Sequence, residues 1–210
     1  MTRPLSSEQI RATRERVLDL ALELLVRDGP ESITLRAVAR AAGMSRSTPY
    51  SYFRDKQAII DGLRARGFRR LAAAYGEAID PASPPLAQLR AAGLCYLRFA
   101  RAEPQLYQLM FGRPVEEATS TELAAAVDAF GQAALAPLLV CRDAGLIDLD
   151  VDMLNRALWA MLHGLVALDG VCSLGGPDEV ERSFDVVGWI ITYGLFRPGV
   201  DPTQPLEVRP

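Results

Sequence analysis

The chain has 210 residues, half of them apolar, which is the composition of a globular protein with one or two packed domains and excludes a disordered polar chain. A formal net charge of −3 argues against nucleic-acid binding when the chain is taken as a whole. The charge is unevenly spread, however, because residues 1–70 hold 14 Lys and Arg against 8 Asp and Glu, while residues 71–210 hold 9 against 18. A basic end on an acidic body is the distribution expected when one domain binds phosphate groups.

The compartment is predicted from three further features. Residues 1–7 are polar and contain a proline, so we expect no signal peptide. The longest apolar run, residues 157–168, fits a buried helix better than a membrane span. The three cysteines, Cys95, Cys141 and Cys172, are far apart and lack metal spacing, which is typical of reduced thiols in a cytoplasmic protein.

The first predicted helix begins after Ser6, because Ser6 and Gln9 have the spacing of a capping box. A broad apolar stripe follows along this helix until Gly29 and Pro30 end the pattern. We therefore expect one long amphipathic helix before residue 30.

The pattern of residues from Thr34 to Leu63 predicts two short helices with a glycine between them, followed by a third helix. Thr34 is a good N-cap, and the apolar residues that follow it recur at helical spacing up to Gly43, where a left-handed residue can stop the helix. Ser45 is expected to cap the second short helix, and Asp55 caps the helix that begins at Lys56. Helix, tight glycine turn, helix is the arrangement that places a second helix in the major groove of DNA.

The first turn of the second short helix carries hydroxyl groups and an arginine, which suit base edges and phosphates. Tyr50 and Tyr52 add hydroxyl groups on rigid rings, and Phe53 is expected to anchor the unit on the helices around it. The alternative is a small helical hairpin whose polar face is merely solvated. The spacing alone does not decide between the two.

The segment from Gly43 to Lys56, GMSRSTPYSYFRDK, resembles the DNA-binding signature of the TetR/AcrR family of transcriptional repressors. The resemblance covers about residues 10–65. It implies that Arg36, Arg46 and Ser47 read bases and that Thr48, Tyr50, Tyr52 and Lys56 hold phosphates. The whole predicted DNA-binding set is Thr34, Arg36, Ser45, Arg46, Ser47, Thr48, Tyr50, Tyr52 and Lys56.

Two positions depart from the family pattern. Pro49 stands where an aliphatic residue is commoner, and Tyr52 stands where a histidine is frequent. Because a proline early in a helix removes few hydrogen bonds, we expect the turn to survive. The departure concerns base preference and leaves the prediction of DNA binding in place.

Beyond residue 56 the whole pattern is helical, and no alternation typical of strands occurs. A helix is predicted from Lys56 towards Ile79, where it would link the DNA-binding head to the body. The proline-rich stretch at residues 80–85 separates it from the body helices. These are expected at residues 86–102, 105–111, 121–144, 152–171 and 178–196, with Pro137 kinking the third. The predicted fold is all-α, with residues 1–55 as a helix-turn-helix domain, 56–200 as a ligand-binding and dimerisation bundle, and 201–210 as a loose tail.

A second resemblance concerns the body. The segments at residues 103–111 and 159–165 are similar to the ligand domain of a TetR subgroup named for a Trp-His-Gly pattern. This implies a site for a small molecule. Aromatic and soft side chains on facing helices supply the predicted ligand set, which is Tyr96, Phe99, Tyr107, Met110, Phe111, Phe130, Trp159, Met161 and His163. The alternative is that each belongs to an ordinary core, with His163 a buried histidine that touches no ligand.

The competing function is a helical enzyme or ligand carrier without a DNA-binding role. The sequence has no nucleophile elbow, no phosphate-binding loop, no dinucleotide loop and no cluster of metal ligands. We therefore expect no catalytic residues, metal or cofactor. The sequence predicts a homodimeric repressor that binds a pseudo-palindromic operator in double-stranded DNA, has no membrane partner and is released by a small, largely apolar effector.

The dimer seam is expected on the last two predicted helices, because they hold more apolar residues than one body can bury. The seam residues predicted from this excess are Leu154, Leu158, Leu165, Val187, Ile190, Ile191 and Leu195. Two heads held about 34–36 Å apart, or a multiple of that distance, would then read one face of the duplex.

Overall fold

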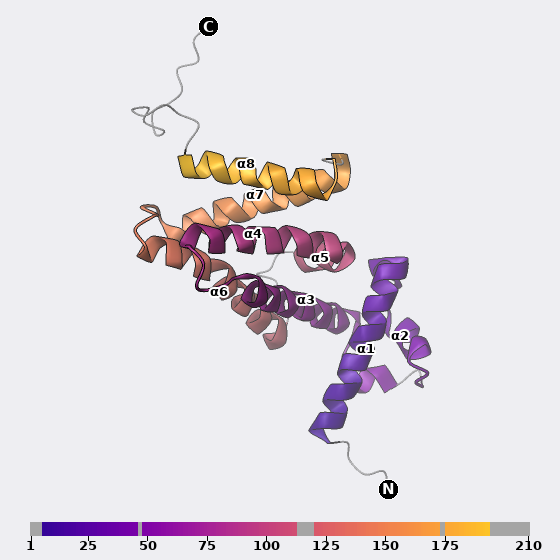
Figure 1. The fold of residues 1–210 in the computed structure, drawn as a ribbon. Helices are drawn as coiled ribbons and strands as arrows, with labels where there is room; N and C mark the ends of the chain where they lie inside the picture. The colour runs from indigo at the N-terminus through magenta and orange to yellow at the C-terminus, as the bar shows by residue number, and fades with distance from the viewer. Residues whose placement is uncertain (1–5, 46–47, 113–119, 173–174, 194–210) are drawn as a thin grey trace. The chain divides into compact units, whose positions relative to one another are not determined.

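The computed structural model describes residues 6–45, 48–112, 120–172 and 175–193, leaving out the side chains of Cys172 and residues 191–193. These ranges form eight α-helices and two 3-10 helices without a strand, which confirms the all-α prediction (Figure 1). The chain divides into two compact units, Met1–Arg156 and Ala157–Pro210. The predicted boundary at residue 55, between a DNA-binding head and a ligand-binding body, lies inside the first unit and stays a prediction.

Helix α1 (Ser7–Asp28) begins at the predicted capping box. The Ser6 hydroxyl accepts a hydrogen bond from the backbone N–H of Gln9 at 3.2 Å, and the N–H of Ser6 donates to Gln9 Oε1 at 2.9 Å. Gly29 ends the helix with a φ of 80°, which a glycine adopts without strain. The short 3-10 helix η1 (Pro30–Ser32) then leads to α2 (Leu35–Ala41).

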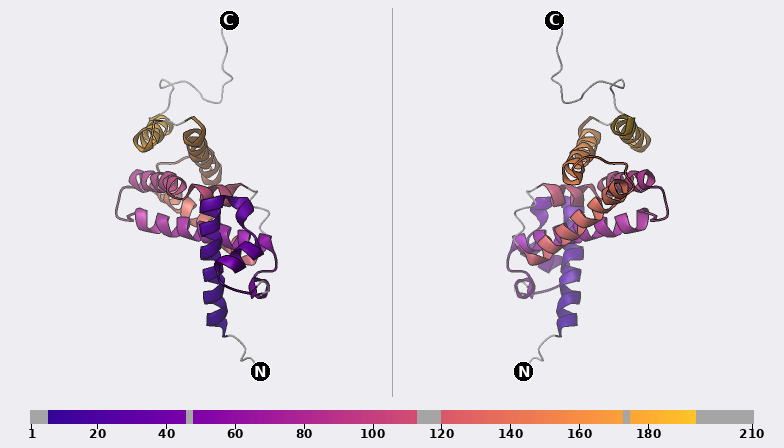
Figure 2. Two further views of the ribbon diagram at one scale, coloured as in Figure 1. Left: turned by 90° about the vertical axis from the view of Figure 1, so that its right-hand side faces the viewer. Right: turned by 90° about the vertical axis from the view of Figure 1, so that its left-hand side faces the viewer.

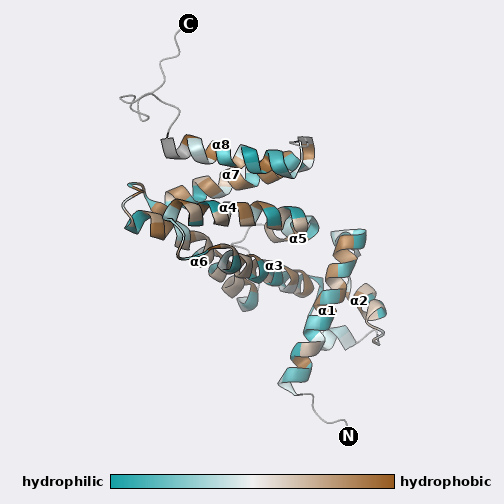
Figure 3. Cartoon of the chain, viewed as in Figure 1, coloured by the Kyte–Doolittle hydropathy of each residue, from teal (hydrophilic) through white to brown (hydrophobic). Residues whose placement is uncertain are grey.

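The second half of α1 supplies much of one core, which we call the head core (Figure 3). Its buried residues are Val17, Leu18, Ala21, Leu24, Leu25, Ile33, Leu35, Val38, Phe53, Ile59 and Leu63. Phe53 is 1 % exposed, so the predicted anchor is confirmed. Leu109, which lies far along the chain, also packs against this core.

Helix α3 (Lys56–Ala78) links the part of the first unit that holds α1 and α2 to the other helices of this unit (Figures 1 and 2). Two glycines let neighbours approach it closely. A Cβ at Gly62 would lie 2.9 Å from Leu18 of α1, and a Cβ at Gly67 would overlap the sulfur of Met110. Gly62 therefore lies against α1 of the head, and Gly67, five residues later, lies against Met110 of the body.

Helices α4 (Pro85–Ala102), α5 (Pro104–Phe111) and α6 (Thr121–Asp143) complete the first unit, and α3 contacts all three. Pro137 lies inside α6, as predicted, and is buried. Helix α6 is long and apolar enough to cross a membrane by length and composition. Leu123, Phe130 and Leu138 of this helix are buried in the first unit.

Helix α7 (Val151–Cys172) begins at the end of the first unit, and α8 (Pro177–Tyr193) returns beside it in the second (Figures 1 and 2). Leu162, Leu165, Val180 and Phe184 are the buried apolar residues there. The predicted bounds of every body helix agree with the structure to within one or two residues over the described ranges. The predicted tail, residues 201–210, lies outside them.

Candidate nucleic-acid interface and effector site

The turn after α2 has the predicted geometry. Gly43 has a φ of 65°, its N–H donates to the Arg40 carbonyl at 3.2 Å, and the N–H of Met44 donates to the Ala39 carbonyl at 2.9 Å. These bonds satisfy carbonyl groups that the end of α2 would otherwise leave unpaired. The side chain of Thr34 caps the start of α2, accepting from the N–H of Ala37 at 3.0 Å.

The structure describes only the later part of the second helix of the motif. Its described part is the 3-10 helix η2 (Thr48–Ser51), and the hydroxyl groups of Ser45 and Thr48 are hydrogen-bonded at 2.7 Å. The cap by Ser45 stays a prediction. Pro49 has no N–H to donate to the Ser45 carbonyl, which accepts a hydrogen bond from the N–H of Thr48 at 3.1 Å. Pro49 is buried, so it fixes the turn on the protein.

Arg14 holds the end of this turn, a role that the sequence pattern of α1 did not reveal. Its Nη1 donates to the carbonyl oxygen of Tyr52 at 2.6 Å, and its guanidinium carbon lies 4.4 Å from the centre of the Phe53 ring. The contact with the ring adds a cation–π attraction to the hydrogen bond. One arginine of α1 thus fixes the two residues that follow η2.

The predicted DNA-binding residues that the structure describes lie on or next to α2 and η2 and at the start of α3. Arg36, Ser45 and Tyr50 are exposed, with Tyr50 57 % exposed, while Thr48 and Tyr52 are half-buried. Arg46 and Ser47, the predicted base readers, lie outside the described residues. Whether these side chains contact DNA stays a prediction.

Lys56 begins α3, as predicted, and its ammonium group lies 3.0 Å from Glu31 of η1. Asp55 caps the helix, accepting from the N–H of Ala58 at 2.8 Å. That backbone hydrogen bond, together with the Arg54 guanidinium, lowers the pKa of the Asp55 carboxyl. The carboxylate therefore keeps its charge and its cap at neutral pH.

A second feature of the first unit is an aromatic cluster on α3, α4, α5 and α6. It consists of Phe68, Tyr75, Tyr96, Tyr107, Phe111 and Phe130. The centres of the Tyr107 and Phe111 rings are 5.0 Å apart, and Phe68 meets Phe111 edge to face at 5.3 Å. Phe68 and Tyr75 were missed because α3 was interpreted only as a link.

The hydroxyl groups of Tyr96 and Tyr107 make a buried polar contact within the cluster, at 3.1 Å. Burial raises the pKa of Tyr107 to about 12, against the opposing effect of its hydrogen bond with Tyr96. Burial also raises the pKa of Tyr75. The phenols therefore remain uncharged at neutral pH, and the cluster presents hydroxyl groups without a formal charge.

The predicted ligand set is divided between the two units. Met110 is fully buried against Gly67 of α3, beside the cluster, whereas Phe99 lines an open groove between α3 and α4. Trp159, Met161 and His163 belong to the second unit, where the Trp159 and His163 rings are 4.8 Å apart. Desolvation lowers the pKa of His163.

Two open grooves lie on the first unit. The one between α3 and α4 has a volume of about 550 Å³ and a floor of alanines beside Cys95. The other, of about 620 Å³, is lined by arginines of α1 and α3 and by Glu122 of α6. Among the described residues, no group of three or more His, Cys, Asp and Glu side chains is placed to hold a metal ion. Cys95 and Cys141 are free thiols.

Two family descriptions match the chain. Residues 17–63 match the bacterial regulatory proteins of the tetR family, and residues 89–187 match the tetracyclin repressor-like C-terminal domain. The first match contains the helix, glycine turn and η2 described above, and the second contains most of the aromatic cluster. The chain belongs to the TetR family. The members of this family are transcriptional regulators, so the enzyme alternative is set aside.

Similar proteins include an uncharacterised helix-turn-helix transcriptional regulator of Mycobacterium tuberculosis, 32 % identical over 102 residues that make up 49 % of this chain and 50 % of the relative. The transcriptional repressor KstR of Rhodococcus jostii is 37 % identical over 67 residues, 32 % of each chain. The chain thus spans half or less of these curated relatives. A solved structure of unknown function from Rhodococcus superposes with a TM-score of 0.75 at 29 % identity, covering 91 % of this chain and 99 % of that one.

Proposed function

We propose that this TetR-family chain is a cytoplasmic, homodimeric transcriptional repressor that binds a pseudo-palindromic operator and is released by a small, largely apolar effector. The observation that carries the proposal is the anchoring of η2. Its buried Pro49, the buried Phe53 and the carbonyl of Tyr52 fix the turn on the head, while Tyr50 remains exposed. A rigid support with polar groups facing outward is what base and phosphate contacts require.

The chemistry of the aromatic cluster supports an uncharged, apolar effector. Its buried polar pair consists of two neutral phenols, which can donate to or accept from one carbonyl or hydroxyl group of a ligand. A carboxylate entering between these rings would lose its hydration without gaining a cation from them. The effector would have to displace packed rings, so binding and a change of packing go together.

Helix α5 gives a path from the cluster to the head. Tyr107 and Phe111 of α5 belong to the cluster, Met110 packs against Gly67 of α3, and Leu109 packs against the head core. A shift of α5 therefore acts on α3 and on the head core together. Release of the operator would follow if the effector binds the shifted arrangement more tightly, since only a difference in affinity can move the equilibrium.

Exposed apolar side chains on α7 and α8 support the proposed homodimer. Trp159 is 39 % exposed, Val186 53 % and Trp189 58 %. Large side chains with this exposure on neighbouring helices are typical of a surface that a partner covers. Leu165, by contrast, is buried within the chain and has little exposed surface to contribute to a dimer seam. The side chain of Ile191 and residue Leu195 lie outside the described residues.

The test is selection of bound duplexes from a random library by the full chain, followed by measurement of its mass on the selected DNA. The proposal expects enrichment of one sequence with inverted half-sites and a bound mass of two chains or a multiple of two. Direct repeats, or a single asymmetric site bound by one chain, would contradict the dimeric operator. Absence of any enrichment would contradict sequence-specific binding.

A further inference from the structure

Arg14 touches the body of the protein as well as the recognition turn. While its Nη1 holds the carbonyl of Tyr52, its Nη2 lies 3.1 Å from the carboxylate of Glu122. Glu122 stands in the first turn of α6, 108 residues further along the chain. One guanidinium thus joins the end of η2 directly to the start of α6.

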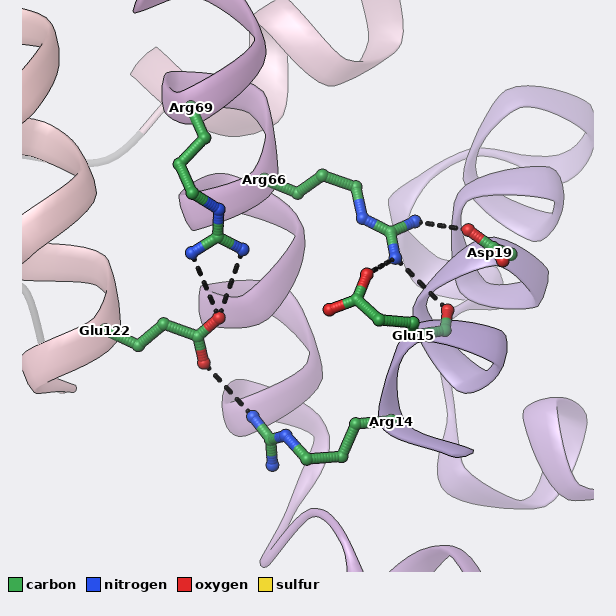
Figure 4. Close-up of polar contacts among 6 residues, drawn as sticks. All are labelled: Arg14, Glu15, Asp19, Arg66, Arg69 and Glu122. Atoms are coloured by element: carbon green, nitrogen blue, oxygen red, sulfur yellow. Dashed lines mark hydrogen bonds and ion pairs between the residues drawn. The ribbon is translucent and has the colours of Figure 1, made fainter. Parts of the chain in front are cut away.

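Glu122 is in turn held from a second side. Its other oxygen, Oε1, accepts from both terminal nitrogens of Arg69 on α3, at 3.2 and 3.1 Å (Figure 4). The carboxylate bridges two arginines, and the first turn of α6, capped by Ser120, carries it. Because both of its oxygens are engaged, its position depends on α1, α3 and α6 at once.

A neighbouring group of ion pairs joins only α1 and α3. Arg66 of α3 binds Glu15 and Asp19 of α1 (Figure 4). These contacts fix α1 on α3, and they contain no group of α6. The bridge through Glu122 is therefore the part of this network that depends on the position of α6. It borders the open groove of about 620 Å³, which leaves its side chains room to rearrange.

We propose that Glu122 is a positioning residue for operator recognition, which sets the direction of the η2 turn relative to α6 and so the half-site spacing that the dimer accepts. The inference rests on the proposed function. With the bridge intact, the turn is fixed to the body through Arg14. Without it, the head keeps its own core and its contacts with bases, but its angle to the body varies more.

The experiment compares the wild-type chain with Glu122→Gln and Asp128→Asn on duplexes that carry the selected half-sites. Asp128 is the matched control, because it lies on α6, is exposed, loses the same charge and contacts Gln132. The half-sites are separated by the selected spacer, by one base pair more or by one base pair less. A duplex with a single half-site measures head binding alone.

The expected result is a relaxed preference for spacing in Glu122→Gln. Its affinity ratio between the selected and altered spacers should fall by about three- to fivefold, the scale of a partly exposed ion-pair network, with single half-site affinity unchanged. Asp128→Asn should retain the wild-type ratio. Arg14→Lys should also relax the ratio and, in addition, weaken single half-site binding, because a lysine cannot hold Tyr52 and Glu122 together.

An unchanged ratio in Glu122→Gln, or an equal change in Asp128→Asn, would overturn the inference while leaving the proposed function intact. If the wild-type chain itself bound none of these duplexes, the proposed function would fail instead. Circular dichroism and urea unfolding of each variant separate a folding defect from a change in spacing. A Glu122→Gln chain that unfolds is replaced by Glu122→Asp, whose shorter side chain cannot reach both arginines and should show the same relaxation.

Discussion

Arg64 of α3 donates two hydrogen bonds to the carbonyl oxygen of Met110, from Nε at 3.2 Å and from Nη2 at 3.1 Å. The guanidinium is 1 % exposed, and the carbonyl belongs to the last turn of α5, where unpaired carbonyl groups carry partial negative charge. Arg64 thus holds α5 on α3. Helix α5 packs against both the aromatic cluster and the head core, and α3 begins at the proposed DNA contact.

We predict that Arg64→Ala lowers the free energy of unfolding by about 2–4 kcal/mol, because it leaves a cavity and removes a charged donor pair from a buried carbonyl. Arg142→Ala is the control. Arg142 lies on the surface of α6 and pairs with its neighbour Asp143, so its loss should cost less than about 0.5 kcal/mol. Urea unfolding measures both, and equal losses would show that the buried arginine contributes little.

Two glycines of α3 provide a matched pair of substitutions that test how closely α5 packs on this helix. A Cβ at Gly67 would overlap the sulfur of the buried Met110, whereas a Cβ at Gly76 would meet nothing within 4 Å. Gly67→Ala should therefore destabilise the fold by about 1–3 kcal/mol. Gly76→Ala should stabilise it by about 0.5–1 kcal/mol, because alanine suits a helix better than glycine. Similar effects of both changes would mean that α5 does not pack closely on α3.

Local features of the fold were predictable from sequence. Thr34, Gly43 and Asp55 act within three or four residues of themselves, and their caps and turn agree with the prediction. Arg14 and Arg64 could not be placed in this way. An arginine in an amphipathic helix looks like a solvated residue, and the partners of these two lie 38 and 46 residues away.

The candidate effector site was predictable in composition but not in arrangement. Aromatic residues on several body helices indicated a cluster, and Tyr96, Tyr107, Phe111 and Phe130 do meet. Helical periodicity shows which residues share a face of one helix but not which faces meet. For the same reason the exposure of Trp189 was missed.

His163 is the single histidine of the chain, so its titration can be followed separately. Its pKa is lowered by burial from an ordinary value of 6.5, and the uncharged form is therefore the one favoured by folding. Its contribution to stability is present above pH 6.5 and is lost as the pH falls below that value towards the folded pKa. Unfolding free energies measured between about pH 7 and pH 5 should fall less steeply in His163→Gln than in the wild-type chain. Parallel curves would contradict a buried, uncharged imidazole.

The dimer surface is tested by a charge placed on α8. Trp189 is 58 % exposed, and Trp189→Glu should convert the dimer to monomer at concentrations where the wild-type chain remains dimeric, because a charge cannot be buried unpaired in the seam. Val26→Glu is the control, since Val26 of α1 is 55 % exposed and lies in the head. Light scattering gives both masses. An intact Trp189→Glu dimer would place the seam elsewhere.

Binding of DNA phosphates by the head, through the start of α3, is tested most directly by the salt dependence of operator binding. Lys56→Gln and Arg27→Gln each remove one positive charge, but Arg27 lies in the last turn of α1 beside Asp28. On one selected duplex, the slope of log affinity against log salt should decrease by about one in Lys56→Gln, because the glutamine cannot neutralise a phosphate. The slope should stay unchanged in Arg27→Gln. Identical slopes in the wild-type chain and Lys56→Gln would contradict phosphate binding at this position.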